Sequence, residues 1–124
     1  MSIRMWCVGA VVIALLLVPL SSDFNGPRVG SKKFTESVVL GDAIAARARA
    51  AEVDVLHARD LGGTRVLFEA LISGEIDVYA EYSGTIAQEI FAGRDLAGEA
   101  SIRGALGELG VRMSAPLGFN NGYA

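Results

Sequence analysis

Residues 27–36, PRVGSKKFTE, pass from a short strand candidate through a loop of glycine, serine and lysine to the start of a helix. A β-rich run, a tight loop and a helical pattern in that order are typical of α/β proteins. We expect the helix to cover residues 36–51, with Thr35 as its N-cap between the stapled side chains of Phe34 and Val39. This stretch therefore predicts one strand–loop–helix unit of a layered fold.

The same device occurs twice more along the chain. The further strands are expected over residues 53–57 and 76–82, the loops at residues 61–64 and 83–85, and the helices over residues 65–73 and from residue 83 to about residue 93. A weaker helix over residues 101–108 and a fourth strand over residues 111–113 follow. Parallel strands joined by right-handed crossovers bring such loops to one edge of the sheet, where open α/β folds bind ligands.

Length and charge restrict the possible functions. The chain has 124 residues, which is room for one modest domain. Its 11 basic against 14 acidic residues give a net charge of -3, which argues against general nucleic-acid binding. The length thus allows a single domain, and the alternating strand and helix patterns predict its class. We expect residues 23–124 to form an α/β domain with a mostly parallel sheet flanked by helices.

The first 22 residues have the pattern of an export signal. Residues 5–20 carry no charge, Arg4 precedes them and two serines follow. A membrane-spanning helix needs about 20 apolar residues, so this run is short for an anchor, although an uncleaved anchor stays open. Cleavage would remove Cys7, the only cysteine, and would leave no disulfide or thiolate metal site.

The sequence offers little support for a catalytic or metal-binding site. His57 is the only histidine and has no second histidine or cysteine with which to share a metal, so we expect a surface or internally satisfied residue. The sequence contains no nucleophile elbow, Walker loop or dinucleotide fingerprint. We expect no cofactor. We expect three acidic residues to be solvated at strand ends and turns: Glu75, Asp77 and Glu81. Glu81 could also support its neighbour Tyr82.

The tyrosines are the sharpest clue to a binding function. Tyr79 and Tyr82 differ by an odd number of positions, so on a strand they face opposite sides. We expect Tyr79 to pack against a helix. Tyr82, at the carboxyl end of the strand, is the better site candidate, with a half-buried strand end as the plainer alternative.

Six blocks of the chain resemble the substrate-binding proteins of ABC importers for glycine betaine, choline and related quaternary amines. They are VGSKKFTES at 29–37, LGGT at 61–64, EAL at 69–71, GEIDVY at 74–79, EYSGT at 81–85 and LGFNNGYA at 117–124. The resemblance implies a type II periplasmic-binding-protein fold, in which two α/β lobes close on the solute. Because the chain stops at Ala124, we expect it to contain the first lobe, with the second lobe missing.

The resemblance also implies a ligand site. In that family tyrosines surround the trimethylammonium group, and lysine and threonine side chains hold a carboxylate when the ligand has one. The matching positions here are Lys32, Tyr82, Thr85, Asn121 and Tyr123, with Ser31 beside the lysine. A quaternary ammonium has no N–H to donate, so aromatic faces are the physically sensible partners.

The expected role is that of an exported, non-enzymatic and monomeric solute-binding lobe that serves an ABC permease and ATPase, in the periplasm or on the outer face of the cytoplasmic membrane. Micromolar binding requires about 8 kcal/mol, which a lone lobe barely reaches, so millimolar affinity for choline or betaine is expected. Three alternatives stay open: a lobe for another solute such as an amino acid, an enzyme using Lys32 or Ser31 with Glu81, and a membrane-tethered adaptor.

Overall fold

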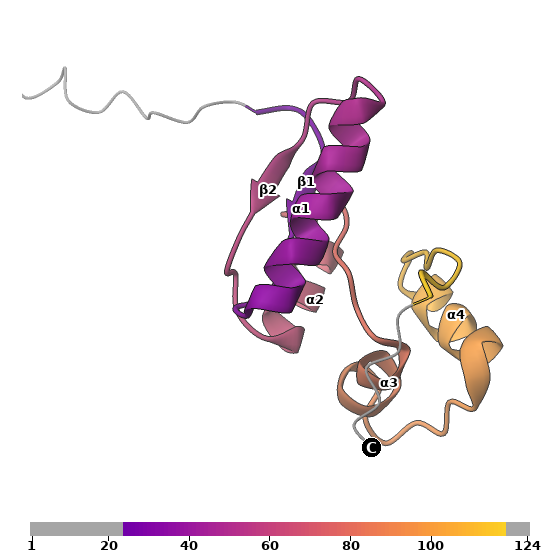
Figure 1. Ribbon diagram of the computed structural model, residues 1–124. Coiled ribbons are helices and arrows are strands. Elements are labelled where there is room, and N and C mark those ends of the chain that lie inside the picture. Colours follow the sequence, from indigo (N-terminus) through magenta and orange to yellow (C-terminus); the bar gives the residue numbers. More distant parts are fainter. Residues whose placement is uncertain (1–23, 119–124) are drawn as a thin grey trace, which may run out of the picture.

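The computed structural model describes residues 24–118 of the chain (Figure 1). Its elements are β1 (Arg28–Gly30), α1 (Thr35–Ala50), β2 (Leu56–Ala58), α2 (Thr64–Ser73), α3 (Ser83–Thr85), the π-helical turn η1 (Ile86–Ile90) and α4 (Gly98–Glu108). The segment expected to be an export signal, together with Cys7, lies outside the described residues. Within residues 24–118, no helix combines the length and apolar character that crossing a membrane requires.

The sheet is small and parallel. Strand β1 pairs with β2, placing Val29 opposite His57. On the other side of β1, Val29 forms a single parallel bridge with Val78, and the Gly30 amide donates to the Val78 carbonyl at 2.8 Å. Strand β1 is therefore central, with the chain around residue 78 as its second neighbour.

Two of the expected strands are corrected by the structure. The strand predicted over residues 76–82 is reduced to the bridge at Val78, and the Tyr82 amide is bound by the Glu81 carboxylate instead of by a neighbouring strand. The strand predicted over residues 111–113 is absent from the described chain. There the Val111 amide bonds back to the Leu106 carbonyl and the Arg103 guanidinium binds nearby carbonyls, so the segment follows α4.

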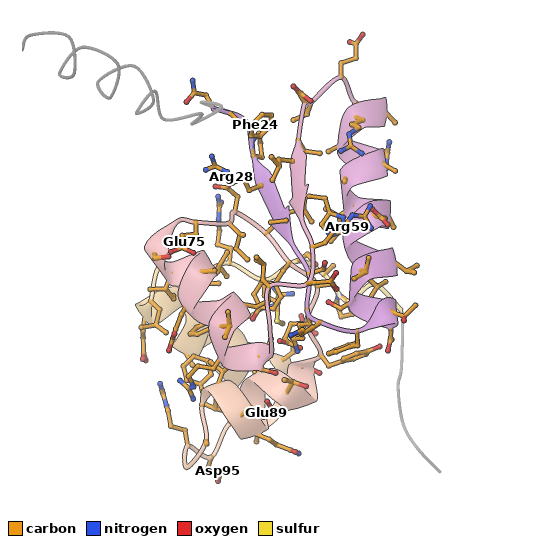
Figure 2. All side chains as sticks on the ribbon, turned by 90° about the vertical axis from the view of Figure 1, so that its left-hand side faces the viewer. Phe24, Arg28, Arg59, Glu75, Glu89 and Asp95 are labelled. Atoms are coloured by element: carbon orange, nitrogen blue, oxygen red, sulfur yellow. The ribbon has the colours of Figure 1, made fainter. Side chains whose placement is uncertain are left out.

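Helices cover both faces of the sheet, as expected for the predicted α/β class. Figure 2 shows α1 and α2 on opposite sides of the strands. Successive residues of a strand point to opposite faces. Val29 accordingly packs toward α1 with Ala45, while the backbone of Gly30 lies close to Leu67 and Ile76 on the α2 side.

A separate apolar cluster attaches the later helices to α2. Phe68 of α2 contacts Phe91 edge to face, with ring centroids 6.4 Å apart. Ile86, Ile102 and Leu106 complete the cluster from η1 and α4. Because aromatic pairs add to the gain from apolar burial, this contact stabilises the position of the segment after Tyr82.

The helix ends agree with the sequence at α2 and differ at α1. Helix α2 ends at Ser73, and its C-cap Gly74 has the left-handed φ of 81° that glycine adopts readily. Helix α1 begins at Thr35, and its N-cap is Phe34. The predicted staple is wrong, because the Phe34 and Val39 side chains stay exposed. Helix α4 begins three residues earlier than predicted.

Candidate functional site

The three predicted loops meet at the carboxyl edge of the sheet. The Lys33 amide donates to the Gly62 carbonyl at 3.0 Å, and the Leu61 amide donates to the Ser31 carbonyl at 3.1 Å, which joins the first two loops. The side chain of Lys32 joins them to the third through Glu81. This edge, which we call the rim (residues 31–33, 61–64 and 81–85), is the candidate site.

Lys32 lies inside the rim. Its Nζ is 2.6 Å from Glu81 Oε1 and 3.1 Å from Thr64 Oγ1, and the lysine and glutamate side chains are only 7% and 6% exposed. The reading of Glu81 as a solvated turn residue is therefore wrong. Charged side chains are rarely buried unless an opposite charge pairs with them, and Lys32 is that partner for Glu81.

The two oxygens of Glu81 have different surroundings. Oε1 accepts from the Lys32 ammonium and from the Tyr82 amide at 3.0 Å. Oε2 is buried and makes no hydrogen bond of ordinary geometry within the described part of the chain. Burial raises the pKa of the Tyr79 hydroxyl, and the charge of Glu81 and a side-chain hydrogen bond to it act in the same direction. Tyr79 packs against the cluster of α2 residues, as the strand spacing predicted.

Tyr82 stands at the exposed side of the rim. The residue is half-buried, it is the N-cap of α3, and its hydroxyl donates to the carboxylate of Glu36 at the start of α1. Thr85, also half-buried, is the last residue of α3. The structure thus brings Lys32, Tyr82 and Thr85 to the same edge, whereas Asn121 and Tyr123 lie outside the described residues.

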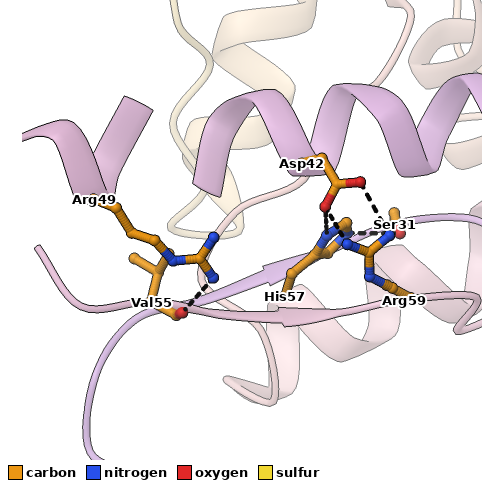
Figure 3. A network of polar contacts seen from close by, with 6 residues as sticks. All are labelled: Ser31, Asp42, Arg49, Val55, His57 and Arg59. Carbon is orange, nitrogen blue, oxygen red and sulfur yellow. Dashed lines mark hydrogen bonds and ion pairs between the residues drawn. The ribbon is translucent and has the colours of Figure 1, made fainter. Parts of the chain in front are cut away.

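Ser31 belongs to a polar network that crosses three elements (Figure 3). Its Oγ is 2.9 Å from His57 Nε2, and His57 Nδ1 is 2.9 Å from Asp42 Oδ1. Arg59 holds both oxygens of the same carboxylate. Since a carboxylate only accepts, Nδ1 donates to Asp42, and in the neutral ring Nε2 accepts the Ser31 hydroxyl proton.

The network has a hydroxyl, an imidazole and a carboxylate in the order that a catalytic triad would have. The burial of its serine argues for a structural role instead. Ser31 is 0% exposed, so no substrate can approach its Oγ in this arrangement. The expectation that His57 is internally satisfied is confirmed, because its side chain is 5% exposed and both ring nitrogens are bound. The network fastens the loop that carries Lys32 to β2 and α1. The sequence gives no signal for it, because its members come from separate elements.

Acid should weaken this network. Hydrogen bonding from His57, then Arg59, lowers the pKa of Asp42, against some burial. A carboxyl whose folded pKa is depressed contributes stability above its unfolded pKa and loses that contribution as pH falls through the folded value. We therefore expect the urea midpoint to fall between about pH 5 and about pH 3, and to fall less in Asp42→Asn. Equal slopes for the two proteins would contradict this.

Comparison with known proteins identifies the chain. Residues 28–124 match the family described as the substrate-binding domain of ABC-type glycine betaine transport systems. The chain belongs to this family. Its members are the binding and not the catalytic component of transport, so the enzyme alternative falls away and the predicted resemblance is confirmed.

One protein of Escherichia coli K12 is similar in both sequence and structure. The chain is 34% identical to its glycine betaine-binding protein YehZ over 82 residues, which cover 66% of this chain and 27% of YehZ. A solved structure of apo YehZ superimposes with a TM-score of 0.61 at 31% identity, covering 68% of this chain and 32% of that one. The chain therefore spans about a third of the length of this relative, and the predicted fold class is confirmed.

Proposed function

We propose that this chain forms the first lobe of an extracytoplasmic solute-binding component of an ABC importer that takes up quaternary amines such as glycine betaine or choline. The observation that carries the proposal is the meeting of Lys32 and Tyr82, through Glu81, at one edge of the sheet, the usual place for ligands in open α/β folds. Thr85 ends the short helix that begins directly after Tyr82. Membership of a glycine betaine transport family gives independent support.

In this proposal Tyr82 presents its ring to the methylated nitrogen. Its hydroxyl is held by Glu36, which fixes the ring and adds negative potential beside it. Tyr123 would supply a second ring, with Asn121 as its polar neighbour. Lys32 and Thr85 would face the carboxylate end of a zwitterionic ligand. Ser31, whose hydroxyl is bound to His57, would act by holding the Lys32 loop in position.

The proposed partners follow from the transport role. The lobe surface would contact a membrane permease, and the permease would work with an ATPase. The proposed location is the periplasm or the outer face of the cytoplasmic membrane, reached through residues 1–22 as an export signal. Release of the protein by osmotic shock, free of membranes, is the expected result, and sedimentation with the membrane fraction would favour a tethered module instead.

Tyr82→Ala tests the proposed cage. A desolvated cation–π contact contributes about 2 kcal/mol, so we expect this variant to lose about 1–2 kcal/mol of binding free energy for glycine betaine and choline alike. Both ligands present the same trimethylammonium group. NMR titration of the 124-residue chain measures such affinities even in the millimolar range.

Tyr82→Phe is the matched control for that titration. It keeps the ring and removes only the hydroxyl that donates to Glu36, so we expect a smaller loss than in Tyr82→Ala. Unchanged affinity in Tyr82→Ala, or displacement of choline by an ordinary amino acid, would refute the quaternary-amine site.

A further inference from the structure

Phe34 breaks two local rules at the edge of the rim. It is the N-cap of α1, a position that favours serine, threonine, asparagine or aspartate because their side chains accept from free helix amides, and it makes no such bond. It is also 51% exposed, although phenylalanine is among the residues most often buried. Residues whose local choices conflict with stability are expected at functional sites.

The folded chain does not use the Phe34 ring for its core. None of the three clusters of buried apolar residues within residues 24–118 includes it. The staple with Val39 is not formed, since both side chains stay exposed. Exchanging Phe34 for another apolar residue should therefore leave the urea midpoint of unfolding close to that of the wild type.

The ring lies next to the residues that join the rim. Lys32 Nζ stands over one face of the Phe34 ring, 5.9 Å from its centroid. The same atom is 2.6 Å from Glu81 Oε1, and Glu81 directly precedes Tyr82. On the other side, Glu36 follows Phe34 by two residues and accepts from the Tyr82 hydroxyl. Short contacts therefore lead from Phe34 to Tyr82 along two routes.

The charges near the ring suit a cation on its outward side. An aromatic ring has a negative face, to which an ammonium group is attracted. The Lys32 ammonium on the inner side is buried and paired with Glu81, so its charge is compensated. The Glu36 carboxylate adds negative potential close by, at the Tyr82 hydroxyl. A methylated ammonium that reaches this part of the rim thus meets an aromatic face and a nearby carboxylate.

We propose that Phe34 is a further ligand-contacting residue of the quaternary-amine site, and that its outward face packs against the trimethylammonium group together with Tyr82. The inference rests on the proposed function and adds a residue that distinguishes a cationic ligand from a neutral one of the same shape. Phe34 has no N–H or O–H group, so this contact depends on its ring alone.

The first experiment titrates choline, followed by NMR, into variants of the 124-residue chain. Choline carries the cation without a carboxylate, so the result does not depend on the role of Lys32. Phe34→Leu keeps an apolar side chain without an aromatic face, and we expect it to weaken choline binding about two- to fivefold. Phe34→Trp should strengthen it, because tryptophan is the best cation–π partner. Val39→Ala, at a 58% exposed position of α1, should leave the affinity unchanged.

The second experiment separates direct contact from a general disturbance of the rim. It uses the neutral alcohol in which a tert-butyl group replaces the trimethylammonium group of choline, so that shape is kept and charge is removed. Phe34→Leu should bind this alcohol as the wild type does. A loss of the same size for choline and for the alcohol would mean that the substitution disturbs the site as a whole, and would overturn the direct contact.

The outcomes also separate this inference from the proposed function. Choline binding that is lost in Tyr82→Ala but unchanged in both Phe34 variants would overturn the role of Phe34 alone. A wild-type chain that binds neither choline nor glycine betaine would overturn the proposed function and, with it, this contact. Should Phe34→Leu fail to fold, Phe34→Trp must still bind choline more tightly than the wild type.

Discussion

Replacing Lys32 by methionine should lower the free energy of unfolding by about 3–5 kcal/mol, because removing one partner of a buried ion pair leaves the other charge uncompensated. Glu81 is 6% exposed, and among the described residues its ion pair is with Lys32, so losing the ammonium leaves its buried carboxylate without an opposite charge. A small domain has about 5–15 kcal/mol of stability, and the expected loss is a large part of it. Urea unfolding measures the change.

A second substitution should repair most of that loss. Lys32→Met with Glu81→Leu removes both charges, and replacing a buried ion pair by apolar side chains of similar volume is often neutral or stabilising. We expect the double variant to unfold much nearer the wild-type midpoint than Lys32→Met. Glu108→Gln is the exposed control: its pair with Arg94 spans 3.3 Å with side chains 65% and 47% exposed, so the loss should stay below about 1 kcal/mol. A double variant as unstable as the single one would show that the pair is not the cause.

The sequence predicts the parts of this molecule that local rules govern. Gly74 ends α2 because a left-handed position suits a residue without a side chain. The alternating units predict an α/β layer, and the chirality of parallel crossovers predicts that the loops carrying Lys32, Thr64 and Tyr82 meet. All of these features are present in the structure.

Contacts between distant elements are the parts that the sequence leaves open. Charged residues are mostly exposed, so Glu81 reads as solvated until its distance from Lys32 is known. Ser31, Asp42 and His57 meet only because a loop, a helix and a strand are brought together. The third strand fails for a similar reason, since the Glu81 carboxylate competes with the sheet for the Tyr82 amide.

Gly41 is not one of the three residues of the Ser31–His57–Asp42 network, yet Gly41→Ala should disrupt that network. A Cβ at residue 41 would lie 2.7 Å from His57 Cε1 and 3.2 Å from Ser31 Cβ, and closer still to the ring nitrogen that binds Ser31. The ring is buried and bound at both nitrogens, so it cannot turn aside without losing a hydrogen bond. Forcing an extra carbon into such a site destabilises by about 1–3 kcal/mol.

Gly104→Ala separates this crowding from the ordinary effect of alanine in a helix. Both glycines are helical, and alanine in a helix interior is favoured over glycine by about 0.5–1 kcal/mol. At Gly104 of α4 a Cβ would meet nothing within 4 Å, so that variant should become more stable. Opposite signs for the two substitutions in urea unfolding are the expected result. Stabilisation by both would mean that the His57 ring moves aside at little cost, and that the loop that carries Lys32 is held by its other contacts, such as the hydrogen bond from the Lys32 amide to Ser37 Oγ.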